Sequence, residues 1–382
     1  MVERTASRRG HRGLSIGSIP TIVWCKLRHN YATLDAMRGT AAIAVVLYHL
    51  GALLYPIQLA ERGYLAVDFF FVLSGFIVAY AYEERLEKGL SRFDFFLIRL
   101  IRFYPLYIVG LLIALIKALA QISIGDAQSM DVGGLLATVL LAIGFLPSPF
   151  GRLDELFPLN VAAWSLFLEL TVNIAYAIAR PRLSNICILA ILIVSGSMLT
   201  WEAFHSTSLM GGAFWSEWWT GIFRVTFSFF MGVLLYRKRA DLLRHLPNIT
   251  SWMLLSCLAA LLAARIPTAF SAWYDLIFIV LLSPALVMLG AKTGNHNRGF
   301  TYLGLISYPL YVIHEPIAIA SRQASQMTGI PPVAFAVMVG VALACATPTL
   351  VYFIDLPARR WLTAHLIGRR PLRVRIESSA RL

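Results

Sequence analysis

The amino-acid sequence predicts an all-α protein: a polytopic membrane helical bundle of about ten transmembrane helices, with both termini in the cytoplasm. Hydrophobic residues make up 58% of the 382 residues and charged residues only 14%, and the mean hydropathy is +0.71. Several apolar runs approach the roughly 20 residues that a helix needs to cross a bilayer. Basic residues gather in short loops and near both ends of the chain.

The expected spans follow one another along the chain as separate apolar runs. They cover residues 33–55, 63–82, 103–121, 161–179, 185–200, 213–236, 251–265, 271–290, 301–320 and 331–354. One more apolar run covers residues 132–147. Two cytoplasmic termini require an even number of crossings, so we expect this run to lie re-entrant or at the interface.

Charge sets the expected orientation and the domain limits. Basic residues are enriched in cytoplasmic loops of membrane proteins, and residues 121–131 hold two aspartates and no basic residue, so this loop should face outward. We expect a basic cytoplasmic tail at 1–30, an integral membrane domain at 31–361 and a second basic cytoplasmic tail at 362–382.

The composition and motifs also exclude several classes of function. The net charge of +13 does not indicate a nucleic-acid partner, because the basic residues lie beside apolar runs. The four cysteines are far apart without metal-ligand spacing, so we expect no metal. No HExxH, Walker or GxGxxG motif occurs. Ser74 and Gly75 are interpreted as packing residues where helices approach closely.

Arg38 and His49 lie eleven positions apart in the run LDAMRGTAAIAVVLYHL. In a helix this spacing brings both side chains to within about 20° of one azimuth, with a rise of about 16 Å. Asp35 can pair with Arg38 on the same face. A cation suits a phosphate and an imidazole suits proton transfer. Because the separation is roughly the length of a phosphopantetheine arm, the pair indicates coenzyme A lying along this helix; the alternative is an anchoring arginine and a core histidine.

A second pair of cations, Arg99 and Arg102, lies in the run FDFFLIRLIRFYPLY. At positions i and i+3 they present two guanidinium forks on the same side of a helix, which suits phosphate. The alternative is a plain cytoplasmic anchor. Pro105 allows a kink or a fresh helix start after them.

A carboxylate stands deep in the apolar run AAWSLFLEL. Such a group is costly in a membrane unless it is paired, so Glu169 is expected to orient an imidazole, hold a substrate hydroxyl or pair with a buried arginine. Trp164 and Ser165 precede it, on the acceptor side of the site or at the membrane interface. Glu217 and Arg224 are seven residues apart and are expected to pair structurally across two turns.

Ser307, Tyr311 and His314 follow an i, i+4, i+7 pattern in the run GLISYPLYVIHEP, so they share one helix face. A second histidine inside a membrane span is a candidate for catalysis or for binding a hydroxyl. A structural or acceptor-side role is favoured for this face, and Tyr308 is placed in the same group.

Taken together, these segments resemble the membrane acyltransferase 3 family, of the O-antigen and exopolysaccharide O-acetyltransferase type, over residues 31–361. The resemblance rests on six motifs in order: LDAMRG followed by His49, VDFFFVLSGF at 67–76, RLIRFYPLY at 99–107, WSLFLE at 164–169, SYPLYVIHEP at 307–316 and YFIDLPARRW at 352–361. One departure is Asp355, where the family more often has glutamate; this position is expected to be structural.

The resemblance implies a multi-pass enzyme of the bacterial inner membrane that moves an acyl group, by default acetyl, from cytoplasmic acyl-CoA to a hydroxyl. The implied acceptor is a glycan or lipid-linked saccharide at the surface. Arg38, Arg99 and Arg102 would hold the phosphates of acetyl-CoA. His49 would lie at the thioester, either as general base or as the nucleophile that accepts the acyl group. Glu169 would orient an imidazole or the acceptor.

The remaining polar groups are assigned to the acceptor side or to structure: Asp35, Trp164, Ser165, Ser307, Tyr308, Tyr311 and His314. The competing interpretation is a membrane transporter or flippase without covalent chemistry, which also places charges inside the bilayer. The sequence disfavours it, because the charged groups follow a donor-site pattern and the second half does not repeat the first.

Overall fold

The computed structural model describes residues 31–51, 59–125, 129–151, 153–294 and 297–368. Within these ranges every long regular element is a helix and no strand is present; the only β pairing is an isolated bridge between Glu155 and Phe214. The all-α prediction is therefore confirmed for the described part of the chain. The predicted tail 1–30 and most of the tail 362–382 lie outside it.

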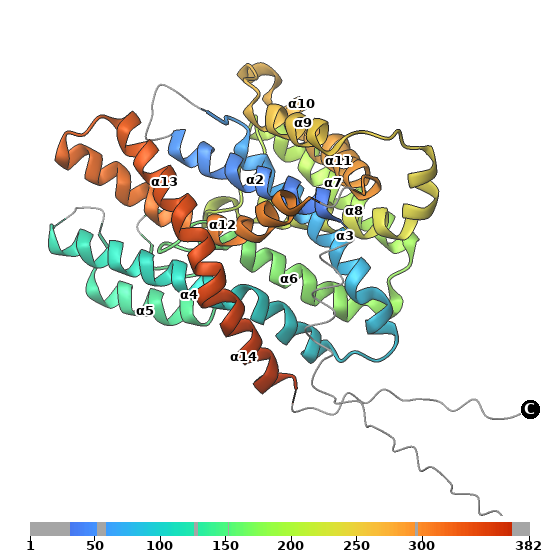
Figure 1. Ribbon diagram of the computed structural model, residues 1–382, viewed down its shortest axis with the longest axis horizontal. Helices are drawn as coiled ribbons and strands as arrows, with labels where there is room; N and C mark the ends of the chain where they lie inside the picture. The colour runs from blue at the N-terminus through green and yellow to red at the C-terminus, as the bar shows by residue number, and fades with distance from the viewer. Residues whose placement is uncertain (1–30, 52–58, 126–128, 152, 295–296, 369–382) are drawn as a thin grey trace, which may run out of the picture.

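The helices follow the predicted apolar runs in order (Figure 1). They are α2 (Ala32–Gly51), α3 (Ala66–Glu87), α4 (Arg92–Ser123), α5 (Val132–Ile143), α6 (Ala163–Ala179), α7 (Asn185–His205), α8 (Trp218–His245), α9 (Ser251–Ala263), α10 (Ser271–Ile277), α11 (Ser283–Lys292), α12 (Arg298–Thr328), α13 (Pro332–Leu350) and α14 (Leu356–Leu366). Short π-helical stretches, Phe278–Leu282 and Val351–Asp355, join α10 to α11 and α13 to α14.

Seven helical segments in the described residues are long and apolar enough to cross a membrane, which makes the chain a multi-pass membrane protein. Three further predicted spans fall on α2, α6 and α9, which are not among the seven. α6 and α9 have 17 and 13 residues, and α2 carries Asp35 and Arg38. Since most of α2 is buried by other helices, its residues need not be as apolar as those that face lipid.

α4 is longer than the predicted span 103–121, because the helix begins at Arg92 and continues through Pro105. Its first turn is capped by Ser91, whose side chain accepts a hydrogen bond from the backbone N–H of Asp94. The fresh helix start that Pro105 allowed does not occur. Arg99 and Arg102 consequently lie within the helix.

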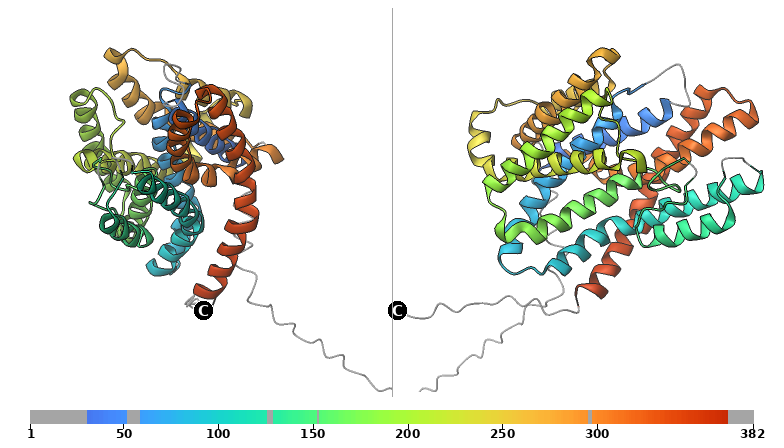
Figure 2. Two further views of the ribbon diagram at one scale, coloured as in Figure 1. Left: turned by 90° about the vertical axis from the view of Figure 1, so that its left-hand side faces the viewer. Right: turned by 180° about the vertical axis from the view of Figure 1, so that it is seen from behind.

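α5 is short and stops beside the middle of α4, and the two run side by side in Figures 1 and 2. The hydroxyls of Tyr104 and Tyr107 donate to the carbonyl oxygens of Ile143 and Ala142 at the end of α5, at 2.9 and 2.8 Å. Its 12 residues rise about 18 Å, less than the roughly 30 Å of a hydrocarbon core. This length agrees with the expectation that 132–147 does not cross by itself.

Glycines let two pairs of helices approach closely. A Cβ atom added at Gly75 of α3 would lie 1.9 Å from the backbone oxygen of Phe229 in α8, and one added at Gly232 of α8 would lie 2.0 Å from that of Val72. A Cβ at Gly304 of α12 would lie 2.5 Å from Asp35 Cβ in α2. The packing role predicted for Gly75 is therefore confirmed.

The expected pair between Glu217 and Arg224 is wrong. Arg224 is 1% exposed and binds Asp68 of α3 with two of its nitrogens, Nη2 to Oδ2 at 2.6 Å and Nε to Oδ1 at 3.1 Å. Glu217 instead accepts a hydrogen bond from the backbone N–H of Gly212 at 3.1 Å. Close packing of α3 on α8 places Asp68 beside the guanidinium, and a buried cation requires a buried carboxylate.

Candidate functional site between helices α2 and α12

The contact between α2 and α12 carries polar side chains at two levels. At the first level, Arg38 of α2 contacts Ser307 and Gly304 of α12. At the second level, His49 of α2 contacts His314 of α12. The levels are separated by about 16 Å of rise along α2 and about 10 Å along α12. The two helices therefore bring together most of the residues predicted from the first motif and from SYPLYVIHEP.

Arg38 is fixed by three groups. Its Nε donates to Ser307 Oγ at 2.9 Å, and its Nη2 donates to the carbonyl oxygen of Gly304 at 2.7 Å. The same Nη2 lies 3.0 Å from Asp35 Oδ1, so the predicted pairing of Asp35 with Arg38 is confirmed. The side chain of Arg38 remains 27% exposed.

The two imidazoles lie with ring centroids 4.8 Å apart. His49 Nδ1 is 2.9 Å from the carbonyl oxygen of Val45, and His314 Nδ1 is 2.6 Å from that of Tyr311. Because a carbonyl oxygen only accepts, each Nδ1 carries the hydrogen of its bond, and each Nε2 presents a lone pair. His314 is 1% exposed, and its Nε2 has no partner among the described residues.

Tyr311 joins this level to α6. Its hydroxyl shares a 2.6 Å hydrogen bond with Ser165 Oγ, and Ser165 also donates to the carbonyl oxygen of Ala162. Trp164, the neighbouring residue, lies with its ring 5.5 Å from the guanidinium carbon of Arg224. Both residues are buried. Ser165 is thus placed next to the face of α12 that carries the second histidine.

Glu169 pairs with a buried arginine, one of the three arrangements expected for it. Its Oε1 accepts from Arg99 Nη2 at 3.0 Å and from Ser74 Oγ at 2.6 Å. The side chains of Arg99 and Glu169 are only 6% and 14% exposed. Among the described residues neither imidazole contacts Glu169. Ser74, interpreted from the sequence as a packing residue, has this polar contact as well, which the pattern FFFVLSGF does not reveal.

Tyr308 marks a third polar region, on a neighbouring face of α12. Its hydroxyl donates to the carbonyl oxygen of Phe103 in α4 at 2.6 Å. The guanidinium carbon of Arg359 in α14 lies 5.9 Å from its ring centre, and Arg359 Nη2 pairs with Asp355 Oδ2 at 2.7 Å. Asp355 is 4% exposed and pairs within its own chain segment, as expected for a structural position.

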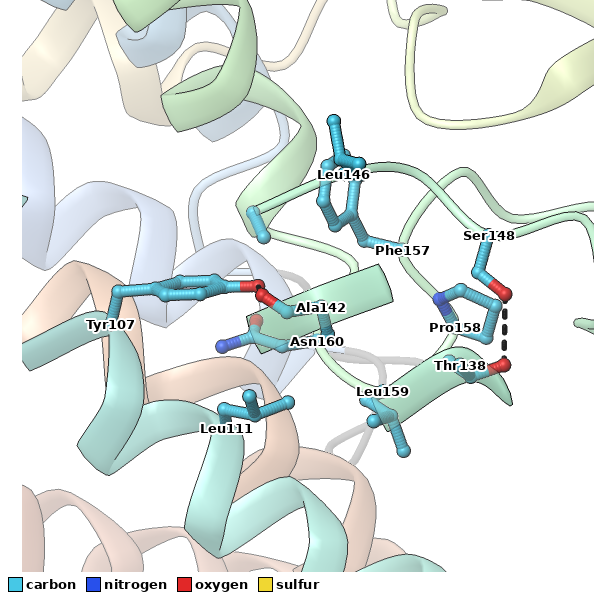
Figure 3. Close-up of a pocket in the computed structure, with 11 residues that line it drawn as sticks. Tyr107, Leu111, Thr138, Ala142, Leu146, Ser148, Phe157, Pro158, Leu159 and Asn160 are labelled. Atoms are coloured by element: carbon cyan, nitrogen blue, oxygen red, sulfur yellow. Dashed lines mark hydrogen bonds between the residues drawn. The ribbon is translucent and has the colours of Figure 1, made fainter. Parts of the chain in front are cut away.

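A pocket in the structure lies away from these groups, between α4, α5 and the segment that leads to α6 (Figure 3). Its walls are mainly apolar, and the hydroxyls of Thr138 and Ser148 bond across one side at 2.8 Å. None of the residues that line it is a predicted site residue. This pocket is therefore separate from the polar groups between α2 and α12.

Comparisons with known proteins give one family. A family model described as an acyltransferase domain matches residues 31–351. Protein 2 of the picA locus of Rhizobium radiobacter is 35% identical over 178 residues, 44% of this chain and 92% of the relative. Acyltransferase MdmB of Streptomyces mycarofaciens is 25% identical over 310 residues, 74% of this chain and 77% of the relative. No solved structure matches.

Proposed function

Because the chain belongs to the membrane acyltransferase 3 family, we propose that it is an O-acyltransferase that takes an acyl group, by default acetyl, from cytoplasmic acyl-CoA. The proposed acceptor is a hydroxyl of a surface or exported glycan, or of a lipid-linked saccharide. The proposed location is the bacterial inner membrane. The reaction ROH + R′C(O)S–CoA → ROC(O)R′ + HS–CoA needs an anion site for the donor and a base for the hydroxyl.

The two-level contact of α2 with α12 is the observation that carries this proposal. Arg38 lies at one level and His49 at the other, about 16 Å further along one helix. Arg99 and Arg102 lie on α4, whose Phe103 accepts a hydrogen bond from Tyr308, the residue that follows Ser307. A donor that lies along α2 with its phosphates at the arginines would bring its thioester to His49.

His49 would remove the proton from the acceptor hydroxyl through Nε2, since Nδ1 already donates to Val45. The hydroxyl oxygen then forms a bond to the acyl carbon, the carbon–sulfur bond breaks, and His49 returns the proton to the thiolate. General base catalysis of this kind contributes about 10²–10⁴ in rate. In the second route, His49 Nε2 attacks the acyl carbon and the carbon–sulfur bond breaks with departure of the thiolate. The hydroxyl then attacks the acyl-imidazole, the bond from the acyl carbon to Nε2 breaks, and the hydroxyl proton passes to the thiolate.

His314 would act on the acceptor. Its buried Nε2 lone pair lies next to His49 and lacks a partner among the described residues. An unpaired buried polar atom is costly, and a second hydroxyl of the acceptor that donates to Nε2 removes this cost. The reacting hydroxyl of the same acceptor is then held beside His49, which takes its proton, and orientation of this kind lowers the barrier to reaction.

Purified protein in nanodiscs, supplied with acetyl-labelled acetyl-CoA and membrane glycans, tests the proposal. Release of free coenzyme A together with label on the glycan supports it. A protein that moves glycan across the bilayer without label transfer or thiol release would instead be a transporter or flippase, and the proposal would be wrong.

A further inference from the structure

Arg359, a guanidinium that the sequence motifs did not assign to any site, reaches the expected donor region from α14. The helix packs against α4, as Figure 1 shows. Arg359 faces the ring of Tyr308, whose hydroxyl is bonded to the backbone of Phe103 in α4. The donor region therefore has walls from α4, α12 and α14.

Three guanidiniums interact electrostatically in this region. Arg102 repels both Arg99 and Arg359 electrostatically. The carboxylates among these neighbours are Glu169, paired with Arg99, and Asp355, paired with Arg359. Like charges close together in a medium of low dielectric are costly, and a bound anion relieves that cost.

The three arginines of this region differ in how far their side chains are exposed to a ligand. The side chain of Arg99 is 6% exposed and pairs with Glu169. The same carboxylate also accepts a hydrogen bond from Ser74. Arg102 is half-buried. Arg359 is 23% exposed on its side chain, and its buried Nε has no acceptor among the described residues.

We propose that Arg102 and Arg359 bind the phosphates of the acyl donor directly, whereas Arg99 positions Glu169 and the wall of the site. Two guanidinium forks from different helices match the two ends of a diphosphate. This inference rests on the proposed function, because it takes coenzyme A as the source of the phosphates.

Coenzyme A binding to the purified full-length protein in phospholipid-free detergent tests the assignment. Arg359→Gln should weaken binding by tenfold or more, because one set of charge-assisted hydrogen bonds is lost. Arg360→Gln is the matched control, since Arg360 is the next residue on the same helix and is exposed. It removes the same charge, and binding should stay within twofold of wild type.

The double variant Asp355→Asn with Arg359→Gln separates binding from structure. If Arg359 only neutralises Asp355, removing both charges restores binding of coenzyme A, and the inference is wrong. If Arg359 binds phosphate, the double variant stays as weak as Arg359→Gln. Asp355→Asn alone should bind coenzyme A at least as tightly as wild type, because it removes a negative charge next to the anion.

Two further outcomes identify the source of the phosphate. In the first outcome, wild type and Arg359→Gln bind coenzyme A equally, but the variant no longer binds phosphatidylglycerol. The site would then bind a lipid headgroup, and this inference would be wrong while the proposed function would stand. Failure of the wild type to bind coenzyme A would overturn the donor assigned under the proposed function, and this inference with it.

Discussion

The imidazoles of His49 and His314 meet edge to face, with ring centroids 4.8 Å apart and an interplanar angle of 69°. They belong to α2 and α12, which lie far apart in the chain and side by side in the fold. Each ring is oriented by a carbonyl oxygen of its own helix. The helix backbones thus fix the nitrogen that each histidine offers to a substrate, and single substitutions can separate the two roles.

His49→Ala should lower acyl transfer by about 10²–10⁴-fold, the usual contribution of a general base, while the protein still inserts and accumulates. The physical reason is the loss of the Nε2 base at the second level of the site. Transfer of label to glycan, measured in membranes with matched protein levels, checks this. Activity near that of wild type would remove His49 from the mechanism.

His314→Asn tests the second imidazole. An asparagine amide can still donate to the carbonyl oxygen of Tyr311, as Nδ1 does now, but it places no lone pair at the position of Nε2. We expect the melting temperature to stay close to wild type and the KM for the acceptor to rise at least tenfold. An unchanged KM in this variant would make His314 a purely structural residue.

Glu169→Gln should destabilise the protein by about 3–5 kcal/mol, because it leaves the charge of Arg99 buried without its partner. Melting temperature and specific activity, measured together, check this. Glu84→Gln is the control: its pair with Lys88 is exposed, so the melting temperature should not change. A stable Glu169→Gln protein that binds acetyl-CoA but transfers no label would instead make Glu169 catalytic.

Gly75→Ala should disrupt the contact between α3 and α8, because a Cβ atom at this position would overlap the backbone oxygen of Phe229. A fall in both melting temperature and yield is expected. Gly340→Ala, in α13, is the matched control, because a Cβ there meets nothing within 4 Å. Equal melting temperatures for the two variants would contradict the close approach of these helices.

Single cysteines, in a protein without its natural cysteines, test the predicted orientation. A membrane-impermeant maleimide added outside should label a cysteine at Asp131, before α5, and should not label one at Arg244 or Arg360. All three positions are exposed in the structure. Labelling of Arg360 from outside would place the end of α14 outside the cell and require an odd number of crossings.

The sequence alone determined the helical membrane class, the order of the helices and the shared face of Arg38 and His49. These follow from local regularities: apolar runs of fixed length, and a turn of about 100° per residue. For the same reason the sequence separates the short run 132–147 from the expected crossings, and Asp35 was correctly paired with Arg38 three residues later. Each conclusion concerns residues within one helix.

Only the tertiary structure decided which distant groups meet. The sequence left three arrangements open for Glu169, and packing of α6 against α3 and α4 selected Arg99. From the sequence we expected Arg224 to pair with Glu217. In the structure, packing of α3 on α8 makes Asp68 the partner of Arg224. A charged side chain inside a membrane needs a partner, and the sequence shows which residues carry such charges. Which partner satisfies each charge depends on how helices cross, and crossing is set by the summed packing of many side chains and glycines rather than by any one motif.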